Sequence, residues 1–404
     1  MLRRIGLKTA LALLAAAFCV TPALAQNQPG VTKDAIKIGN TIPYSGPASA
    51  YAAIGKADAA YFKMINDQGG VNGHKVDFIS LDDGYSPPRT VEQIRRLVER
   101  DQVAFIFNSL GTPTNSAIQK YLNDHKIPQL FVSTGADKWG NYKDFPWTMG
   151  WQPSYRIEAQ IYAKQILAEK PEAKIAILYQ NDDFGKDYLA GVKDVLGEKF
   201  DKMVVTASYE VTDPTIDSQA VSLKSSGADV LITAATPKFA AQIIRKVADM
   251  DWKPMHFLSN VSISVGAVIE PAGPDRATGI VTAAYLKDPG DPAWDQDPGM
   301  QAYKAFLKKY IPGGDVSDLS YEYGYSVTMT LIQVLKQCDN NLSRDNIMKQ
   351  AANLHDVQIP TLLPGITVNT SPTNYHPIRQ SQLARWNGKH WELFGHVIEG
   401  AGSY

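Results

Sequence analysis

The sequence predicts an α/β protein with two doubly wound parallel-sheet lobes joined by a three-segment hinge. Three observations support this fold class. Short apolar runs alternate with amphipathic stretches from residue 35 to about residue 285, the alternation breaks near residue 150 and then restarts, and the last segment has the pattern of a β-hairpin. Strands that alternate with helices at this spacing are typical of a parallel sheet with helices on both faces.

The first half of the chain supplies one set of strands and helices. Apolar runs predict strands over residues 36–39, 76–81, 103–107 and 129–132. The amphipathic stretches between them predict helices over residues 48–68, 91–100 and 114–125. Gly69 and Gly70 mark the end of the first helix.

A second set follows the irregular segment 145–151. Apolar runs predict strands over residues 174–179, 204–207, 230–233 and 256–259. The stretches between them predict helices over residues 184–198, 218–226 and 239–250. The second set is similar in size to the first, which predicts a second lobe.

The remainder of the chain divides between the two lobes. Helices are predicted over residues 292–310, 317–338 and 343–354, and they are expected to cover the first lobe because they have no strands of their own. Strands over 382–386 and 391–397 flank an Asn-Gly turn, a strong hairpin signal, and are assigned to the second lobe. The chain is then expected to cross between lobes near residues 150, 285 and 360. The predicted domain limits are 34–150 plus 285–358 for lobe 1, and 151–284 plus 359–404 for lobe 2.

The first 25 residues have the pattern of a secretory signal peptide. Arg3, Arg4 and Lys8 precede an apolar run over residues 11–20, and Ala23-Leu24-Ala25 gives a small-residue cleavage site after Ala25. The protein is therefore predicted to be exported and soluble. Removing these three basic residues leaves 37 basic against 41 acidic residues, a net charge of −4 with no basic block, so nucleic acid is not an expected partner.

The mature chain lacks the motifs of common enzymes and metal sites. It has no G-x-S-x-G, H-E-x-x-H, C-x-x-C or phosphate-binding loop, and its seven histidines are scattered. Cys338, the one cysteine left after cleavage, lies in an apolar helical pattern and is predicted to be buried. The Asp82-Asp83 and Asp182-Asp183 pairs are expected to cap loops and helices. We therefore expect no catalytic residues, no metal and no cofactor, but binding in a cleft between the lobes.

Two loops at predicted strand ends are candidates for the binding site. Ligands of open α/β sheets bind at the carboxyl ends of strands, and the loops after strands 103–107 and 129–132 are small and rich in hydroxyl groups. Free backbone N–H groups at a helix start favour an anion, so together the loops are expected to grip a carboxylate. Ordinary capped turns remain the alternative for either loop alone. The candidates are Ser109, Leu110, Gly111, Thr112, Ser133, Thr134, Gly135 and Ala136.

Aromatic residues gather near the same strand ends and the expected crossings. Their concentration indicates an aromatic pocket, and core packing is the alternative explanation. We therefore add five of them to the candidate ligand-binding residues: Tyr51, Trp151, Tyr155, Phe184 and Tyr285. Tyr44 and Tyr85 belong to the same group of aromatics.

Several segments together resemble the leucine/isoleucine/valine-binding protein family, the type I periplasmic binding proteins of ABC importers. Residues 42–47 (Ile-Pro-Tyr-Ser-Gly-Pro), then the helix end at residues 65–73, are similar to the opening of that family. Asp82-Asp83, Ile127-Pro128 and Asp183-Phe184-Gly185 continue the similarity in the same order, over residues 34–400. The resemblance implies a two-lobed fold that closes by hinge motion on a solute, without enzymatic activity, and a monomer that docks on an ABC permease in the inner membrane.

The resemblance also implies roles for individual residues. Tyr51 matches a pocket aromatic, and Phe184 matches a second-lobe aromatic. Ser109 and the Gly111-Thr112 backbone match one segment that holds the ligand carboxylate, and Gly135-Ala136 match the other. Thr236 occupies a position that is usually tyrosine.

Two departures from the family concern the ligand. Amino-acid binders carry an acidic residue after the strand that matches 256–259, where it pairs with the ligand ammonium; the matched position here is Val261, and no Asp or Glu occurs between Asp251 and Glu270. A buried ammonium without that partner costs on the order of several kcal/mol. Asp137 replaces a usual threonine. If its side chain faced the cleft it would repel an anion, and alternatively it could supply the missing acid.

The leading hypothesis for the ligand is therefore a small organic acid with an aromatic body, such as a benzoate or cinnamate. A branched-chain or other amino acid remains an alternative. A ligand-sensing receptor domain and a secreted two-lobed enzyme are the alternatives from other functional classes.

Overall fold

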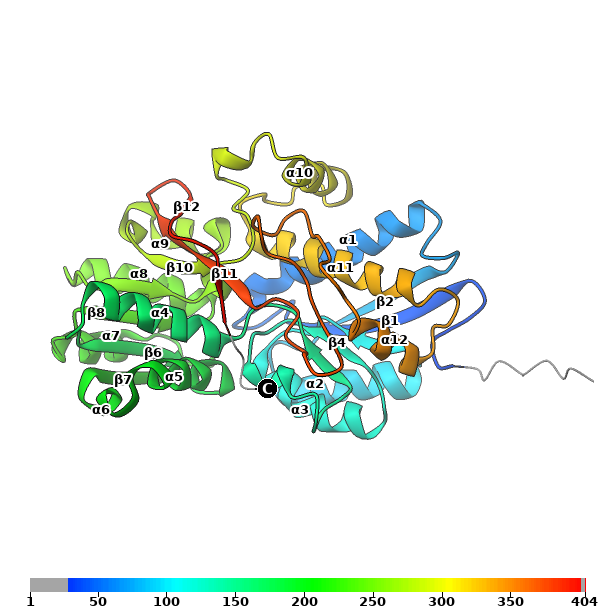
Figure 1. Ribbon diagram of the computed structural model, residues 1–404, viewed down its shortest axis with the longest axis horizontal. Coiled ribbons are helices and arrows are strands. Elements are labelled where there is room, and N and C mark those ends of the chain that lie inside the picture. The colour runs from blue at the N-terminus through cyan, green and yellow to red at the C-terminus, as the bar shows by residue number, and fades with distance from the viewer. Residues whose placement is uncertain (1–27, 401–403) are drawn as a thin grey trace, which may run out of the picture.

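The computed structural model describes residues 28–400 and residue 404, and these residues form two α/β lobes (Figure 1). Each lobe is built on its own sheet, with the first lobe at the right of Figure 1 and the second, in green, at the left. The predicted fold class is confirmed. The predicted signal peptide lies outside the described residues.

The first sheet has five parallel strands in the order β2-β1-β3-β4-β5. The strands are β1 (Ala35–Ile42), β2 (Lys75–Asp82), β3 (Phe105–Phe107), β4 (Gln129–Val132) and β5 (Thr148–Gly150). The helices between them are α1 (Ala52–Asp67), α2 (Pro87–Arg95) and α3 (Thr112–Asp124).

Three later helices return to this lobe. They are α10 (Pro298–Tyr310), α11 (Leu319–Gln337) and α12 (Arg344–Ala351). Helix α11 packs along α1, and α12 packs against α11 (Figure 1). Cys338 caps the C-terminal end of α11 and is buried, as predicted, and burial raises the pKa of its thiol to about 12.

The second sheet follows the order β12-β11-β10-β9-β8-β6-β7, with β13 paired to the start of β11. Its strands are β6 (Ile175–Gln180), β7 (Val204–Tyr209), β8 (Val230–Ala234), β9 (Met255–Leu258), β10 (Val281–Ala284), β11 (Gln380–Trp386), β12 (Trp391–Leu393) and β13 (Ile398–Glu399). Strands β6 to β10 are parallel, and the C-terminal hairpin adds antiparallel strands at one edge.

Six helices complete the described part of the second lobe, and short 3-10 or π segments occur in both lobes and in their connections. The helices are α4 (Tyr155–Glu169), α5 (Asp183–Leu196), α6 (Phe200–Met203), α7 (Asp217–Ser225), α8 (Pro237–Asp249) and α9 (Glu270–Ala272). The short 3-10 or π segments are Ser49–Tyr51, Arg96–Arg100, Asp137–Gly140, Gly197–Lys199, Asn260–Ser262, Val265–Ile269, Pro274–Ala277 and Pro292–Trp294.

Local sequence explains where several helices begin. The side chain of the residue before the helix accepts a backbone N–H at α4, α5, α10, α11 and α12. Proline occupies the first turn of α2, α3, α8 and α10, where it sacrifices no helical hydrogen bond. One of these caps is Asp182, whose carboxylate accepts from the Phe184 N–H, so its predicted capping role is confirmed.

Some predicted elements end elsewhere in the structure. The strand predicted over 391–397 stops at Leu393, because Gly395 has a φ of 68° and turns the chain before Ile398–Glu399 pairs with the start of β11. The strand predicted from residue 103 begins at Phe105, because the N–H of Val103 bonds to Leu97 instead of to a strand. Strands β5 and β10 and helix α4 lie outside the strand and helix ranges that the sequence predicts.

The element order gives three passages between the sheets: from β5 to α4, from β10 to α10, and from α12 to β11. The exact limits of the two domains stay a prediction. Within residues 28–400, no helix combines the length and the apolar character that crossing a bilayer requires.

Candidate ligand site between the lobes

A cavity lies where the strand ends of the two lobes face each other. The volume open to the centres of water-sized molecules is about 100 Å³. Eight aromatic side chains line it: Tyr51, Tyr85, Tyr155, Phe184, Tyr285, Trp294, Tyr323 and Trp391. Among the described lining residues none is Lys, Arg or His, and Asp288 is the one acid.

The structure brings together eleven of the fifteen predicted ligand-site residues around this cavity. They are Tyr51, Leu110, Gly111, Thr112, Ser133, Thr134, Tyr155, Phe184, Thr236, Val261 and Tyr285. They come from both lobes and from the segment after β10, so strand ends that are far apart in the sequence share one space.

The other four predicted residues lie behind the wall. Ser109 Oγ accepts from the Thr41 N–H at 3.0 Å, and the Gly135 carbonyl accepts from the Tyr155 N–H at 2.7 Å. Trp151 is fully buried, with its indole N–H bonded to Thr330 Oγ1 at 3.0 Å. Ala136 is buried just before the turn Asp137–Gly140. In this structure the four residues pack behind the residues that line the cavity. The prediction that they contact the ligand directly stays a prediction.

The two hydroxyl-rich loops of the first lobe lie side by side. Leu110 and Ser133 form a parallel bridge, and the Gly111 N–H bonds to the Ser133 carbonyl at 3.3 Å. Thr112 Oγ1 and Thr134 Oγ1 are 2.5 Å apart. Helix α3 begins at Thr112, so its positive N-terminal end faces the cavity and favours a negative group there.

A buried acid fixes the first of these loops from beneath. Asn108, which starts the loop, has a φ of 54°, a left-handed conformation that asparagine tolerates. Its side-chain amide donates to both oxygens of Asp58 on α1, at 3.1 and 2.9 Å. Asp58 also accepts from Thr328 Oγ1 on α11 at 3.0 Å and from Asn40 Nδ2 at 3.5 Å. Asp58 thus links two helices and the loop.

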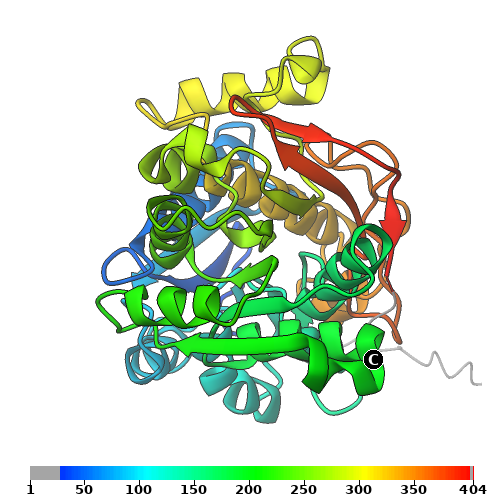
Figure 2. The ribbon, with the colours of Figure 1, turned by 90° about the vertical axis from the view of Figure 1, so that its left-hand side faces the viewer.

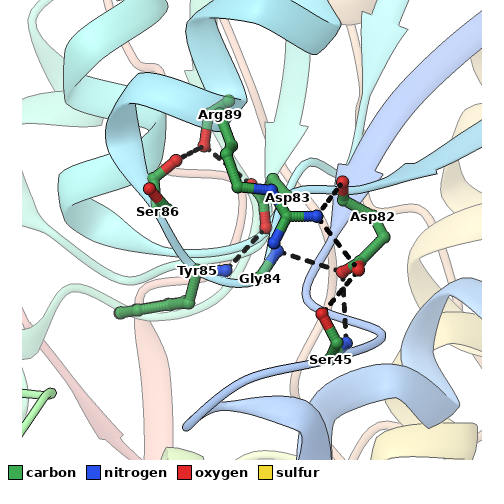
Figure 3. A network of polar contacts seen from close by, with 8 residues as sticks. Ser45, Asp82, Asp83, Gly84, Tyr85, Ser86 and Arg89 are labelled. Atoms are coloured by element: carbon green, nitrogen blue, oxygen red, sulfur yellow. Dashed lines mark hydrogen bonds and ion pairs between the residues drawn. The ribbon is translucent and has the colours of Figure 1, made fainter.

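The Asp82-Asp83 pair shapes the loop that carries Tyr85 (Figure 3). Asp82 accepts from the N–H and the hydroxyl of Ser45, and from the Gly84 N–H at 3.0 Å. Asp83 accepts from the N–H of Tyr85 at 2.9 Å, and Tyr85 has a left-handed φ of 60°. The capping role predicted for this pair therefore applies to the loop; the α2 N-cap itself is Ser86. The result is an aromatic ring held against the cavity.

Aromatic packing forms the wall on the side of the second lobe. The rings of Tyr155 and Phe184 lie 4.6 Å apart, and Tyr188 packs edge-on against Phe184 at 5.8 Å. The Thr236 N–H bonds to Tyr209 Oη at 3.0 Å, which fixes the loop after β8. These contacts give the cavity a rigid, largely apolar face.

Asn260, the second residue after β9, lines the cavity and is not among the candidates that the sequence predicts. Its backbone N–H and its side-chain amide donate to the two oxygens of Glu158, at 2.9 and 2.5 Å. Applying the strand-end rule to this loop would have identified Asn260. No sequence signal of that kind marks Tyr323, Trp294 or Trp391, because they lie on late segments whose position depends on the three passages between lobes.

Asp137 does not line the cavity. It is 3% exposed and accepts from Ser154 Oγ at 2.6 Å, with His376 Nε2 at 3.7 Å. Its side chain does not reach the cavity, so the condition for repelling an anion is not met and it supplies no acid to the wall in this structure. Ser154, the cap of α4, draws the carboxylate toward the second lobe instead.

Asp288 is the acid that does line the cavity. One oxygen accepts from the Gly290 N–H and the other from the Trp391 N–H, both at 2.9 Å. Burial raises the pKa of this carboxyl. Both oxygens already have protein partners, so Asp288 primarily organises the surrounding backbone.

Direct hydrogen bonds join the two lobes around the cavity. Tyr51 Oη donates to the Val261 carbonyl at 2.9 Å, Gln180 Nε2 donates to Tyr85 Oη at 3.3 Å, and Ser264 Oγ donates to Asp318 Oδ1 at 3.0 Å. We call these three bonds the seam. They hold the lobes in contact on the cavity's margin.

Stability is expected to fall as pH rises from 5 to 8, because buried carboxyls must lose a proton. Burial raises the pKa of Glu158 and of Asp187 to about 7, and that of Glu322 well above its ordinary value. Neither oxygen of Glu322 has a hydrogen-bond partner among the described residues. Well below their ordinary pKa values these three carboxyls are protonated in both states, and their contribution to stability is fully present. As pH rises toward 7 the unfolded chain releases protons that the folded chain retains, at a cost on the order of 2 to 3 kcal/mol for Glu158.

Denaturant unfolding at each pH checks this expectation. Glu158→Gln removes one titrating group, so the fall in the free energy of unfolding between pH 5 and pH 8 should be smaller in this variant. A free energy of unfolding that increases across this range would contradict the pKa directions given above.

Comparisons with known proteins agree with this architecture. A family model described as periplasmic binding protein matches residues 35–390. The curated "Leu/Ile/Val-binding protein homolog 7" of Brucella abortus (strain 2308) is 23% identical over 373 residues, which cover 88% of this chain and 89% of the relative.

Solved structures share the fold. A branched chain amino acid ABC transporter protein from Thermus thermophilus with bound valine has a TM-score of 0.81 at 16% identity, covering 92% of this chain and 98% of that chain. A fatty acid ABC transporter substrate-binding protein from Thermomonospora curvata has a TM-score of 0.75 at 21% identity, covering 92% and 94%. With the family match over residues 35–390 and a cavity enclosed by the strand ends of two lobes, the chain belongs to the periplasmic binding protein family.

Proposed function

We propose that this chain is the solute-binding subunit of an ABC uptake system. It is exported to the periplasm, captures a small organic acid between its lobes without altering it, and delivers it to permease subunits in the inner membrane. The leading ligand is an aromatic carboxylate of the benzoate or cinnamate type.

The composition of the cavity wall supports this ligand class. Thr112, Ser133 and Thr134 offer hydroxyl groups beside the N-terminal end of α3, which suits a carboxylate. Aromatic rings surround the remaining space, which suits an aromatic body. Val261 stands where the family resemblance places the acid that pairs with an ammonium group, and a ligand without an ammonium needs no such partner.

An amino acid is the second candidate. Asp288 gives the cavity one carboxylate, and the curated relatives are named for leucine, isoleucine and valine. The two backbone N–H groups that Asp288 already accepts weigh against this candidate, because an ammonium would have to share those oxygens.

A ligand panel tests the two candidates against each other. The protein is unfolded and refolded to remove any solute that co-purifies, then titrated by calorimetry with benzoate, cinnamate, leucine and valine. We expect the aromatic acids to bind and to raise the melting temperature, with about 2.7 kcal/mol of added stability at a hundred times the dissociation constant. A response to leucine or valine alone would refute the aromatic-acid proposal.

Uptake measurements test the transport role. Cells that lack this gene should lose high-affinity import of the ligand found in the panel, and the wild-type gene should restore it. Unchanged import with a lost transcriptional response would instead indicate a receptor. Recovery of a modified ligand after incubation with the protein would indicate an enzyme.

A further inference from the structure

The cavity extends well beyond the strand-end loops of the proposed site. Along the second sheet its wall includes Phe184 after β6, Thr236 after β8, Val261 after β9, Leu286 after β10 and Trp391 in β12. The sheet order puts β6 and β12 five strand positions apart. Neighbouring strands are separated by about 4.8 Å, so β6 and β12 lie roughly 24 Å apart along the sheet.

Wall residues that follow several different strands all border this one cavity. A site whose wall reaches across several strands suits an extended chain, or a flat ring system with a chain, better than a compact branched side chain such as that of leucine.

The end of the cavity farthest from β6 is mainly apolar. We call it the tryptophan end, formed by Ile263, Leu286, Trp294, Leu363, Trp391 and Leu393. Asp288 also lines the cavity beside Trp391, with both of its oxygens accepting backbone N–H groups. None of these residues belongs to the strand-end loops that are suited to a carboxylate. The cavity thus has a polar end on the first lobe and an apolar end beneath the C-terminal hairpin.

Specific interactions hold both tryptophans in place. The Trp391 N–H bonds to Asp288 Oδ2 and its indole N–H bonds to the Ile263 carbonyl, each at 2.9 Å. Lys287 Nζ lies 5.1 Å from the centre of the Trp294 ring, pairs with Asp297 at 2.8 Å and is buried. Trp294 lies in the segment that leads into α10. In both ribbon views the tip of the hairpin lies beside this segment (Figures 1 and 2). The tryptophan end is therefore a firmly built surface.

We infer that the tryptophan end is a binding subsite for the apolar tail of the substrate, and that the substrate is an elongated monocarboxylate of the aryl-alkyl or long-alkyl class. This inference rests on the proposed function, since it assumes that the carboxylate binds at Thr112, Ser133 and Thr134. Burial of each methylene at the tryptophan end adds affinity, and a one-ring acid leaves that end unused.

A chain-length series tests the inference. The refolded protein is titrated with benzoate, 3-phenylpropanoate, 5-phenylpentanoate and 7-phenylheptanoate. Affinity should rise by about threefold or more for each methylene buried, until the cavity is filled. Leu393→Arg puts a long cation at the tryptophan end and should abolish the gain from 3-phenylpropanoate to 7-phenylheptanoate. Val221→Arg, at an exposed site outside the cavity, should retain it.

The outcomes separate the two proposals. If benzoate binds and affinity is flat or falls with chain length, the tail subsite is wrong and the proposed function stands. If no acid in the series binds, the proposed function itself fails. Trp294→Ala is a second variant should Leu393→Arg fail to fold, and a gain with chain length that survives Trp294→Ala in a folded protein would also overturn the inference.

Discussion

Replacing Asp58 by alanine will lower the free energy of unfolding by about 3 kcal/mol, because it leaves several buried donors without an acceptor. Asn108 Nδ2 and Thr328 Oγ1 donate to this carboxylate from two other segments of the first lobe, and all three side chains are fully buried. The change will also release the loop that begins at Asn108, so ligand affinity should fall together with stability. Denaturant unfolding and calorimetry measure the two effects.

Asp67→Ala is the matched control for this prediction. Asp67 lies at the end of the same helix, α1, where it forms an exposed ion pair with Lys63. Such surface pairs contribute little to stability, so this variant should unfold like the wild type within about 0.5 kcal/mol. Equal stability of Asp58→Ala and Asp67→Ala would show that the buried network does not stabilise the lobe.

Gly111→Ala is expected to reduce ligand affinity by about a hundredfold. Gly111 has a φ of 104°, where a side chain is strained, and an added Cβ would lie 2.5 Å from the Tyr85 ring and 2.6 Å from Thr114 Oγ1. The ring must move into the cavity or the start of α3 must shift, and either change disturbs the wall that we propose for the carboxylate. Titration with the ligand identified in the panel measures the loss.

Gly313→Ala separates backbone strain from the clash. Gly313 also has a positive φ, 82°, but an added Cβ there meets nothing within 4 Å. It should cost about 1 kcal/mol of stability and leave ligand affinity unchanged. A wild-type affinity in Gly111→Ala would mean that the loop before α3 does not bind the ligand.

Most of the fold could be predicted from the sequence, because each sheet is made of short apolar runs separated by amphipathic helices. Helix α4 shows where that signal fails. Its buried residues, which include Glu158 and Tyr162, occupy several sides of the helix, because α4 packs on α5 and also points a carboxylate toward Asn260. A helix buried on several sides lacks the one-sided apolar pattern that sequence analysis detects. Strands β5 and β10, with the sequences Thr-Met-Gly and Val-Thr-Ala-Ala, lack the large apolar residues that mark equally short strands such as β3 and β4.

The dependence on tertiary packing also explains why only part of the candidate site could be predicted from the sequence. Leu110, Gly111, Ser133 and Thr134 directly follow predicted strands, so the rule that ligands bind at strand ends places them at the cavity. The tryptophan end obeys no such rule. Trp391 reaches the cavity because the hairpin closes the edge of the second sheet, and this depends on tertiary packing that local pattern does not encode.

The seam affects the overall affinity for solutes differently from the preference among solutes. Bonds such as that from Tyr51 to the Val261 carbonyl join protein to protein, so their contribution to bringing the lobes together is the same whatever solute is carried. Weakening them would lower the affinity for all cargoes by one common factor and leave their ranking intact. Natural variation at Gln180 and Asp318, the two seam residues that do not line the cavity, would therefore change the overall affinity for solutes without altering which solute is preferred.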